Sequence, residues 1–139
     1  MSRAIDIMTE NPVSISIAAS VGDAIQVLQN LEVRHVPVID ESQKLVGMIS
    51  DRDVRAIAIP HTIDEQWLGD FRVALETEIT RVMSSNVIAI EEEAETSEII
   101  ELMLEHKVGA LPVTDDEGTL VGIVSYVDVL RELYELETT

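Results

Sequence analysis

The chain contains the same pattern twice, at a constant spacing of 75 residues. Residues 45–54 read LVGMISDRDV and residues 120–129 read LVGIVSYVDV, and the match extends over both halves without a gap. A repeat of this length that occurs only twice indicates a duplicated small domain, because solenoid proteins need more repeats than two. Identical pairs include Met8/Met83, Asn11/Asn86, Val33/Val108, Pro37/Pro112, Gly47/Gly122, Ser50/Ser125 and Asp53/Asp128.

Each copy predicts the element order β-α-β-β-α. A short β segment is followed by a helix whose apolar residues recur at helical spacing. Ser20 with Asp23 predicts a capping box for the first helix, and Thr96 or Ser97 could cap the second. Two strands joined by a polar turn come next, and a last helix starts directly after a serine. The strands are expected at 12–17, 35–40 and 44–50 in the first copy, and at 86–90, 110–115 and 119–125 in the second.

The repeat therefore predicts an α/β protein made of two β-α-β-β-α units. Repeat 1 is expected at residues 1–57, a connector with a helix at 58–79, and repeat 2 at 80–139. A single core below roughly 70 residues seldom has stability to spare, so the repeats should pack together about a pseudo-twofold axis. Trp67 and Phe71 are four residues apart and should hold the connector against the body.

Composition narrows the function. The 139 residues include no cysteine, so disulfides and thiolate metal sites are excluded and a reducing, cytoplasmic setting is expected. The net charge of −18 opposes binding to nucleic acid or to an anionic membrane. Glycine-rich phosphate loops are absent, and His35, His61 and His106 lack metal-ligand spacing. We therefore expect a binding protein that is not an enzyme and has no metal site of its own.

The doubled strand-to-helix turn admits two interpretations. In both copies a glycine is followed three residues later by serine and six residues later by aspartate. Seen once, the serine and aspartate would be read as a capping box at the start of the helix. Seen twice, they also suggest a site where a hydroxyl, a carboxylate and free N–H groups meet a vicinal diol such as a ribose. The glycine would then let the ligand approach the backbone closely.

These motifs resemble the tandem CBS domains. The likeness rests on Met-Thr or Met-Ser before a β segment, on apolar-Pro-Val-x-Asp, and on Gly-x-x-Ser-x-x-Asp, each present twice over residues 5–57 and 80–133. It implies two clefts between the repeats that bind adenine nucleotides or related adenosyl ligands, with Asp on the ribose hydroxyls and Ser on ribose or phosphate. The first cleft would use Ser50, Asp53, Arg34, His35, Arg52, Asn86, Val87, Ile88 and Val108. The second would use Ser125, Asp128, Thr9, Asn11, Pro12, Val13 and Val33.

The two clefts are not equal in charge. Arg34, His35 and Arg52 of the first copy are replaced by Gly109, Ala110 and Val127 in the second. Phosphate recognition needs charge-assisted donors, so the first cleft is expected to take a phosphorylated adenine nucleotide. The second could be empty, hold an uncharged adenosyl group, or borrow Arg34. Mg²⁺ could accompany a bound polyphosphate.

The resemblance leads us to expect a stand-alone regulatory module that senses AMP, ADP or ATP and signals to an unidentified effector protein. We also expect a homodimer, formed through helix faces around Leu28, Leu31, Met103 and Leu104. Two alternatives remain open. The chain could be a structural dimerisation or interaction module with vestigial clefts, or it could bind another adenosyl ligand such as S-adenosylmethionine or NAD.

Overall fold

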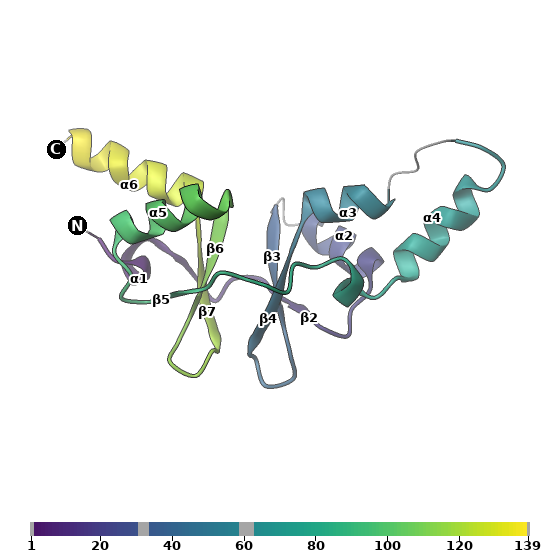
Figure 1. The fold of residues 1–139 in the computed structure, drawn as a ribbon, viewed down its shortest axis with the longest axis horizontal. Coiled ribbons are helices and arrows are strands. Elements are labelled where there is room, and N and C mark those ends of the chain that lie inside the picture. Colours follow the sequence, from purple (N-terminus) through teal and green to yellow (C-terminus); the bar gives the residue numbers. More distant parts are fainter. Residues whose placement is uncertain (1, 31–33, 59–62, 139) are drawn as a thin grey trace. The chain divides into compact units, whose positions relative to one another are not determined.

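The computed structural model describes residues 2–30, 34–58 and 63–138, and within them helices alternate with short strands (Figure 1). The strands form two sheets, with the orders β1-β7-β6-β5 and β2-β3-β4. The predicted α/β class with two β-α-β-β-α repeats is confirmed. The elements are α1 Ala4–Ile7, β1 Thr9–Glu10, β2 Ile15–Ser16, α2 Val21–Asn30, β3 His35–Ile39, β4 Leu45–Ser50, α3 Asp51–Ala58, α4 Trp67–Glu76, the 3-10 helix η1 Ile79–Arg81, β5 Ile90–Glu91, α5 Thr96–His106, β6 Ala110–Thr114, β7 Leu120–Ser125 and α6 Tyr126–Thr138.

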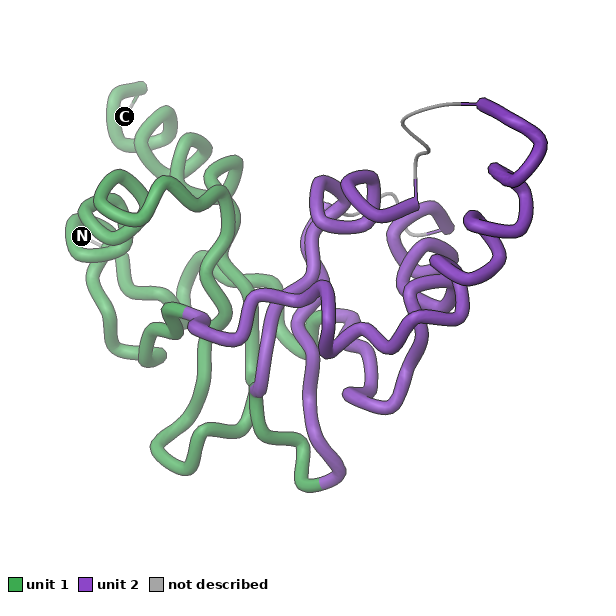
Figure 2. Tube along the Cα trace, turned by 45° about the vertical axis from the view of Figure 1, so that its right-hand side comes forward, with its two compact units in different colours: residues 1–12, 42–45, 88–139 green, residues 13–41, 46–87 purple. Residues whose placement is uncertain are grey.

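The chain divides into two compact units (Figure 2). Unit 1 contains residues 1–12, 42–45 and 88–139, and unit 2 contains residues 13–41 and 46–87. Unit 2 lies within residues 13–87, whereas unit 1 joins the N-terminal segment 1–12 to the C-terminal segment 88–139, so the boundaries of both units are shifted from those of the sequence repeats. The division into repeats at 1–57 and 80–139 stays a prediction about the sequence, while the packing follows the shifted boundaries.

The shift arises because the segment before each β-α-β-β-α pattern pairs with the last strand of the other repeat. In unit 1, β1 runs antiparallel to β7, with Thr9 opposite Ile123. In unit 2, Ser84 forms the corresponding antiparallel bridge with Met48. Subtracting or adding 75 converts one pair into the other, so both units have the same register at this edge.

Equivalent positions fill the two cores. The core of unit 2 is built around side chains from β2, β3, β4 and η1, and α2 covers it. The core of unit 1 uses the matching positions of β5, β6, β7 and α1, and α5 packs against β6. The strands expected at 35–40, 44–50, 110–115 and 119–125 are present, whereas those expected at 12–17 and 86–90 are reduced to the two-residue strands β2 and β5. The matched buried pairs are Ile15/Ile90, Val36/Leu111, Val38/Val113, Ile49/Val124, Val54/Val129, Leu28/Met103 and Ile79/Ala4.

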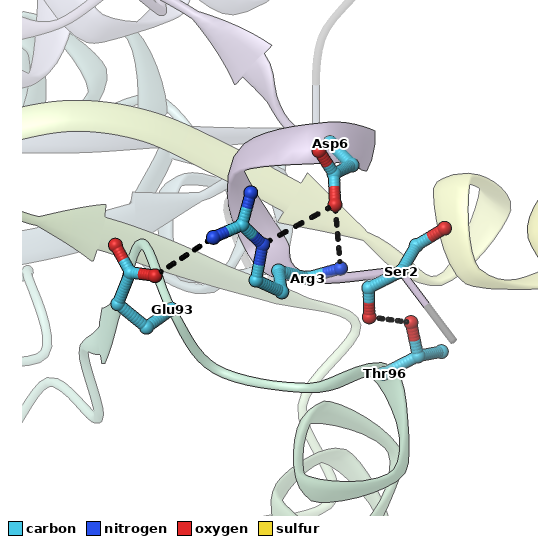
Figure 3. A network of polar contacts seen from close by, with 5 residues as sticks. All are labelled: Ser2, Arg3, Asp6, Glu93 and Thr96. Carbon is cyan, nitrogen blue, oxygen red and sulfur yellow. Dashed lines mark hydrogen bonds and ion pairs between the residues drawn. The ribbon is translucent and has the colours of Figure 1, made fainter.

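The helix caps agree with the prediction in one unit only. Ser20 N donates to Asp23 Oδ2 at 2.9 Å and Asp23 N to Ser20 Oγ at 3.2 Å, which confirms the capping box of α2. The proposed cap of α5 is wrong. Glu95 occupies the N-cap, and buried Thr96 is the first helical residue; its hydroxyl donates to Ser2 O at 2.9 Å (Figure 3). Thr96 thus binds the N-terminal segment rather than its own helix.

Polar contacts of Arg3 also attach the N-terminal segment to unit 1 (Figure 3). The guanidinium lies 3.0 Å from Glu93 Oε2, and the backbone N–H of Arg3 donates to Asp6 Oδ2 at 2.9 Å. Both side chains of the Arg3–Glu93 pair are at least half exposed, so the pair contributes little to stability. The backbone bond from Ala4 N to Ala94 O, at 2.7 Å, is the stronger attachment.

Two predictions about exposed surfaces need correction. Phe71 packs against the core of unit 2, but Trp67 is 37% exposed, so only Phe71 holds α4 in place as predicted. Leu28 and Met103 are core residues and cannot form the dimer surface proposed for them, whereas Leu104 is exposed. Leu31, the fourth residue of that surface, lies outside the described residues, as does His61.

Candidate functional site

The strand-to-helix turn of unit 2 has the geometry of a capping box. The strand β4 ends at Ser50 and α3 begins at the next residue. Ser50 N donates to Asp53 Oδ2 at 2.9 Å, and Asp53 N donates to Ser50 Oγ at 3.1 Å. Within the described residues, Asp53 Oδ1 accepts no hydrogen bond, and Asp53 remains partly exposed. The cap and the ligand interpretation are therefore compatible, because one carboxylate oxygen holds the helix and the other remains available.

Arg34 and His35 lie beside this turn. Asp51 N, at the start of α3, donates to Arg34 O at 3.0 Å, which places the start of β3 next to the start of the helix. Arg34 and Arg52 are exposed, so both guanidinium groups can reach a solvent-borne phosphate. We call the group Arg34, His35, Ser50, Arg52 and Asp53 the first half-site.

His35 does not act as a fixed cation. Burial lowers the pKa of His35 below its usual 6.5, and Arg34 lowers it further, while Asp51 and Asp53 partly oppose the shift. Its imidazole is therefore mainly neutral near pH 7 and serves as a hydrogen-bonding group. The expectation that Arg34 and His35 both supply positive charge holds only for Arg34.

Ser84 pairs with the edge of β4 in the same unit. Met48 N donates to Ser84 O at 3.0 Å, and Ser84 N donates to Met48 O at 2.8 Å. Asn86 and Val87 therefore belong to the same compact unit as the first half-site. Ile88 and Val108, the other residues predicted for the first cleft on this side, belong to unit 1 and pack against its core, so their part in the cleft stays a prediction.

Gly47 and Gly122 accommodate methionine. A Cβ on Gly47 would lie 2.5 Å from Met83 Sδ and 3.1 Å from Ser84 O. A Cβ on Gly122 would overlap the side chain of Met8. The expectation that these glycines keep the backbone open to a ligand is wrong, because methionine of the preceding segment fills the space. The repeated methionine and the repeated glycine are thus one packing contact, made once in each unit.

The equivalent turn of unit 1, which we call the second half-site, contains Ser125, Asp128, Gly109 and Arg131. Tyr126 N donates to Gly109 O at 2.9 Å, as Asp51 N does to Arg34 O. Asp128 Oδ2 accepts from Ser125 N at 2.8 Å and from Ser125 Oγ at 3.1 Å. Arg131 Nη1 lies 3.4 Å from Asp128 Oδ1. This ion pair was not predicted, although its i,i+3 spacing on a helix is a usable signal.

The other residues predicted for the second cleft are divided between the units. Thr9 pairs with β7, Asn11 N donates to Val121 O at 3.2 Å, and both belong to unit 1 with Pro12. Val13 belongs to unit 2. Val33 lies outside the described residues.

No group of three His, Asp or Glu side chains could hold a metal ion in the described part of the chain. None of the helices described for this chain combines the length and the apolar character needed to span a membrane.

Comparison with known proteins agrees with the doubled motif. The family model described as CBS domain matches residues 4–59 and 78–135. The chain is 31% identical over 131 residues to inosine-5′-monophosphate dehydrogenase of Methanocaldococcus jannaschii, covering 94% of this chain but 23% of that protein. The chain therefore spans less than a quarter of that relative's length.

Solved structures of similar chains contain adenosyl ligands. The structure of CBSX2 in complex with AMP superposes with a TM-score of 0.82 at 26% identity and covers 99% of both chains. The CBS domain pair of protein MJ0100, in complex with 5′-methylthioadenosine and S-adenosyl-L-methionine, superposes with a TM-score of 0.78 at 25% identity. That match covers 95% of this chain and 99% of the other.

Proposed function

Because the chain belongs to the CBS-domain family, we propose that it is a regulatory module that binds AMP, ADP or ATP at the first half-site. The observation that carries this proposal is Asp53 Oδ1 at the start of α3, which accepts no hydrogen bond from the described part of the chain and belongs to the same half-site as Arg34 and Arg52. A carboxylate with vacant acceptor positions suits the two hydroxyls of a ribose, and guanidinium groups suit a phosphate. The AMP bound to CBSX2 supports the choice of an adenine nucleotide.

The charge distribution favours the first half-site for a phosphorylated ligand. The whole chain carries −18, so it repels free nucleotides except where cations gather. Arg34 and Arg52 provide two permanent positive charges within one half-site, and neutral His35 can donate or accept a hydrogen bond there. The equivalents Gly109, Ala110 and Val127 provide none. Mg²⁺ would enter with a polyphosphate, through the phosphate oxygens.

Calorimetric titration with AMP, ATP and adenosine tests this proposal. Asp53→Ala should weaken all three ligands alike, by about 1.5–3 kcal/mol, because a charged acceptor for the ribose is lost. Arg34→Ala should weaken AMP and ATP far more than adenosine. Asp53→Asn is a second variant, which keeps an oxygen to accept the bond from Ser50 N. Arg55→Ala controls for the loss of a positive charge, because Arg55 lies on the same helix but pairs with Asp51. Equal losses for AMP and adenosine in Arg34→Ala would contradict the phosphate role.

Two alternatives are separated by the same titrations. A module whose half-sites are vestigial would bind none of the ligands, and Asp53→Ala would leave its behaviour unchanged. A binder of another adenosyl compound would respond to S-adenosylmethionine, 5′-methylthioadenosine or NAD instead of AMP; the ligands of MJ0100 motivate the first two. Such a result would keep Asp53 as the ribose contact and remove the phosphate role of Arg34.

We further propose that the module forms a homodimer through α6, leaving other surfaces for an effector protein. Tyr126, Val127, Leu130, Leu133 and Tyr134 are each 41–70% exposed and share one side of this helix. The equivalent positions of α3 include Asp51, Arg52 and Arg55, although Val54 and Val129 are buried alike. The fold therefore does not require apolar residues on this side of the helix, which favours an intermolecular role.

Light scattering during gel filtration tests self-association. Leu130→Glu should convert a dimer into a monomer because it places a charge in the middle of the apolar surface. Leu104→Glu is the matched control, since Leu104 is 73% exposed on α5. A monomeric wild-type protein, or a dimer lost only in Leu104→Glu, would contradict the α6 surface.

A further inference from the structure

The two half-site carboxylates differ in how much hydrogen-bonding capacity they have left. An ionised carboxylate offers about four acceptor positions. Within the described residues Asp53 uses one of them, for Ser50 N. Asp128 uses three, for Ser125 N, Ser125 Oγ and Arg131 Nη1. A ribose diol donates two hydrogen bonds, so Asp53 can accept both and Asp128 cannot without releasing a present partner.

Arg131 is the partner whose release changes the capacity of Asp128 most directly. Of the three donors, Arg131 is the one that binds Asp128 Oδ1. The equivalent Oδ1 of Asp53 accepts no hydrogen bond from the described residues. The position equivalent to Arg131 in α3 is Ala56, which has no donor. Ser125 has its counterpart in Ser50, although within the described residues only Ser125 also donates its hydroxyl to the aspartate. That bond goes to Asp128 Oδ2, so the difference at Oδ1 comes from Arg131.

We propose that Arg131 is a specificity-determining residue that makes the second half-site the weaker ribose site and so sets the order in which the half-sites fill. This inference rests on the proposed function, because it concerns the same carboxylates. Arg131 occupies Asp128 Oδ1 until a ribose displaces it. The first half-site, with alanine at the same place, fills without such a competition.

The size of the effect follows from the exposure of the ion pair. The Arg131 side chain is 62% exposed while Asp128 is 15% exposed. The guanidinium can therefore move into water easily, and an exposed pair of this kind shifts an equilibrium only about two- to fivefold. Adenosine is the appropriate probe, because a phosphate would also be attracted by Arg131 and would obscure the competition.

The test is an NMR titration of the whole chain with adenosine, with backbone amides as local reporters. Ser50 and Asp51 report the first half-site, and Ser125 and Tyr126 report the second. In the wild-type protein the first pair should saturate at the lower concentration. Arg131→Met should tighten adenosine binding at the second half-site about two- to fivefold. Arg3→Met removes one charge from the same unit without touching Asp128 and should change nothing.

The reciprocal variant separates a role in binding from a role in helix stability. Ala56→Arg should weaken adenosine binding at the first half-site by a similar factor, whereas Ala56→Met, of comparable length but uncharged, should not. If Arg131 only stabilised its helix, arginine at position 56 would not weaken adenosine binding at the first half-site. An unchanged ratio of the two affinities in both arginine variants, or weaker binding in Arg131→Met, would overturn the inference alone. Silence of all four amides with adenosine and AMP would overturn the proposed function with it.

Discussion

Unit 1 and unit 2 share several backbone contacts but differ in the side chains placed on them. Val21 N donates to Thr77 O in unit 2 as Thr96 N donates to Ser2 O in unit 1. Ile79 N donates to Ala19 O as Ala4 N donates to Ala94 O. Each of these two bonds in unit 2 becomes its counterpart in unit 1 by a shift of 75 residues. The comparison separates what the fold needs, which is common to both units, from the side chains that differ, to which the proposed ligand and partner contacts are assigned.

Core truncation should produce the largest effect and tests whether the two units are equally well packed. Ile49 and Val124 are equivalent, and both have no exposed surface. Ile49→Ala should reduce the free energy of unfolding by about 2–5 kcal/mol, because it removes buried methyl groups and leaves a cavity. Val124→Ala removes one methylene less and should cost about 1 kcal/mol less. Equilibrium unfolding in urea, followed by circular dichroism, measures both values.

The exposed residue Ile57, on α3, supplies the control for this pair. It is 38% exposed, so Ile57→Ala should stay within about 0.5 kcal/mol of the wild-type protein. A cost of Val124→Ala equal to or above that of Ile49→Ala would break the equivalence of the cores. It would mean that unit 1 collapses around a cavity less readily than unit 2.

Much of the fold could be predicted from sequence because the predictive residues act locally. Alternating apolar residues predicted strands at 35–40 and 110–115. The observed strands β3 and β6 start at the same residues and end one residue earlier. Ser20 and Asp23 gave a capping box, since a cap depends on residues three positions apart. The two-residue strand β1 was missed, because it exists only through pairing with β7, more than 110 residues further along the chain.

The hydrogen-bonded pairs of the candidate sites could be predicted from the sequence, but the burial and the non-local contacts of their residues could not. The pairing of Ser50 with Asp53 was expected from spacing, and its hydrogen bonds are present. Burial of His35 depends on how β3 packs, so its lowered pKa could not be seen in the sequence. The glycines were assigned to a ligand for the same reason: the contact of Gly122 with Met8 is non-local. Repetition indicated candidate residues, but not what each one touches.

A smaller effect is expected where the units differ in one buried hydroxyl. Thr96 and its equivalent Val21 are both fully buried, and the Thr96 hydroxyl adds a bond to Ser2 O that Val21 cannot make (Figure 3). Thr96→Val should cost about 0.5–1.5 kcal/mol, because Ser2 O keeps its bond from Thr96 N and no polar group is stranded. The urea titrations described above measure this cost.

Hydrogen exchange at Ala4 N, which donates to Ala94 O, reports whether Thr96→Val loosens the N-terminal segment. Exchange there should accelerate, while exchange at the equivalent Ile79 N should not. The converse change, Val21→Thr, would place a hydroxyl near Thr77 O, the acceptor that matches Ser2 O. It should therefore cost less than the about 1–3 kcal/mol of an unpartnered buried hydroxyl. A full penalty would show that the surroundings of this position, unlike its backbone bonds, are not interchangeable between the units.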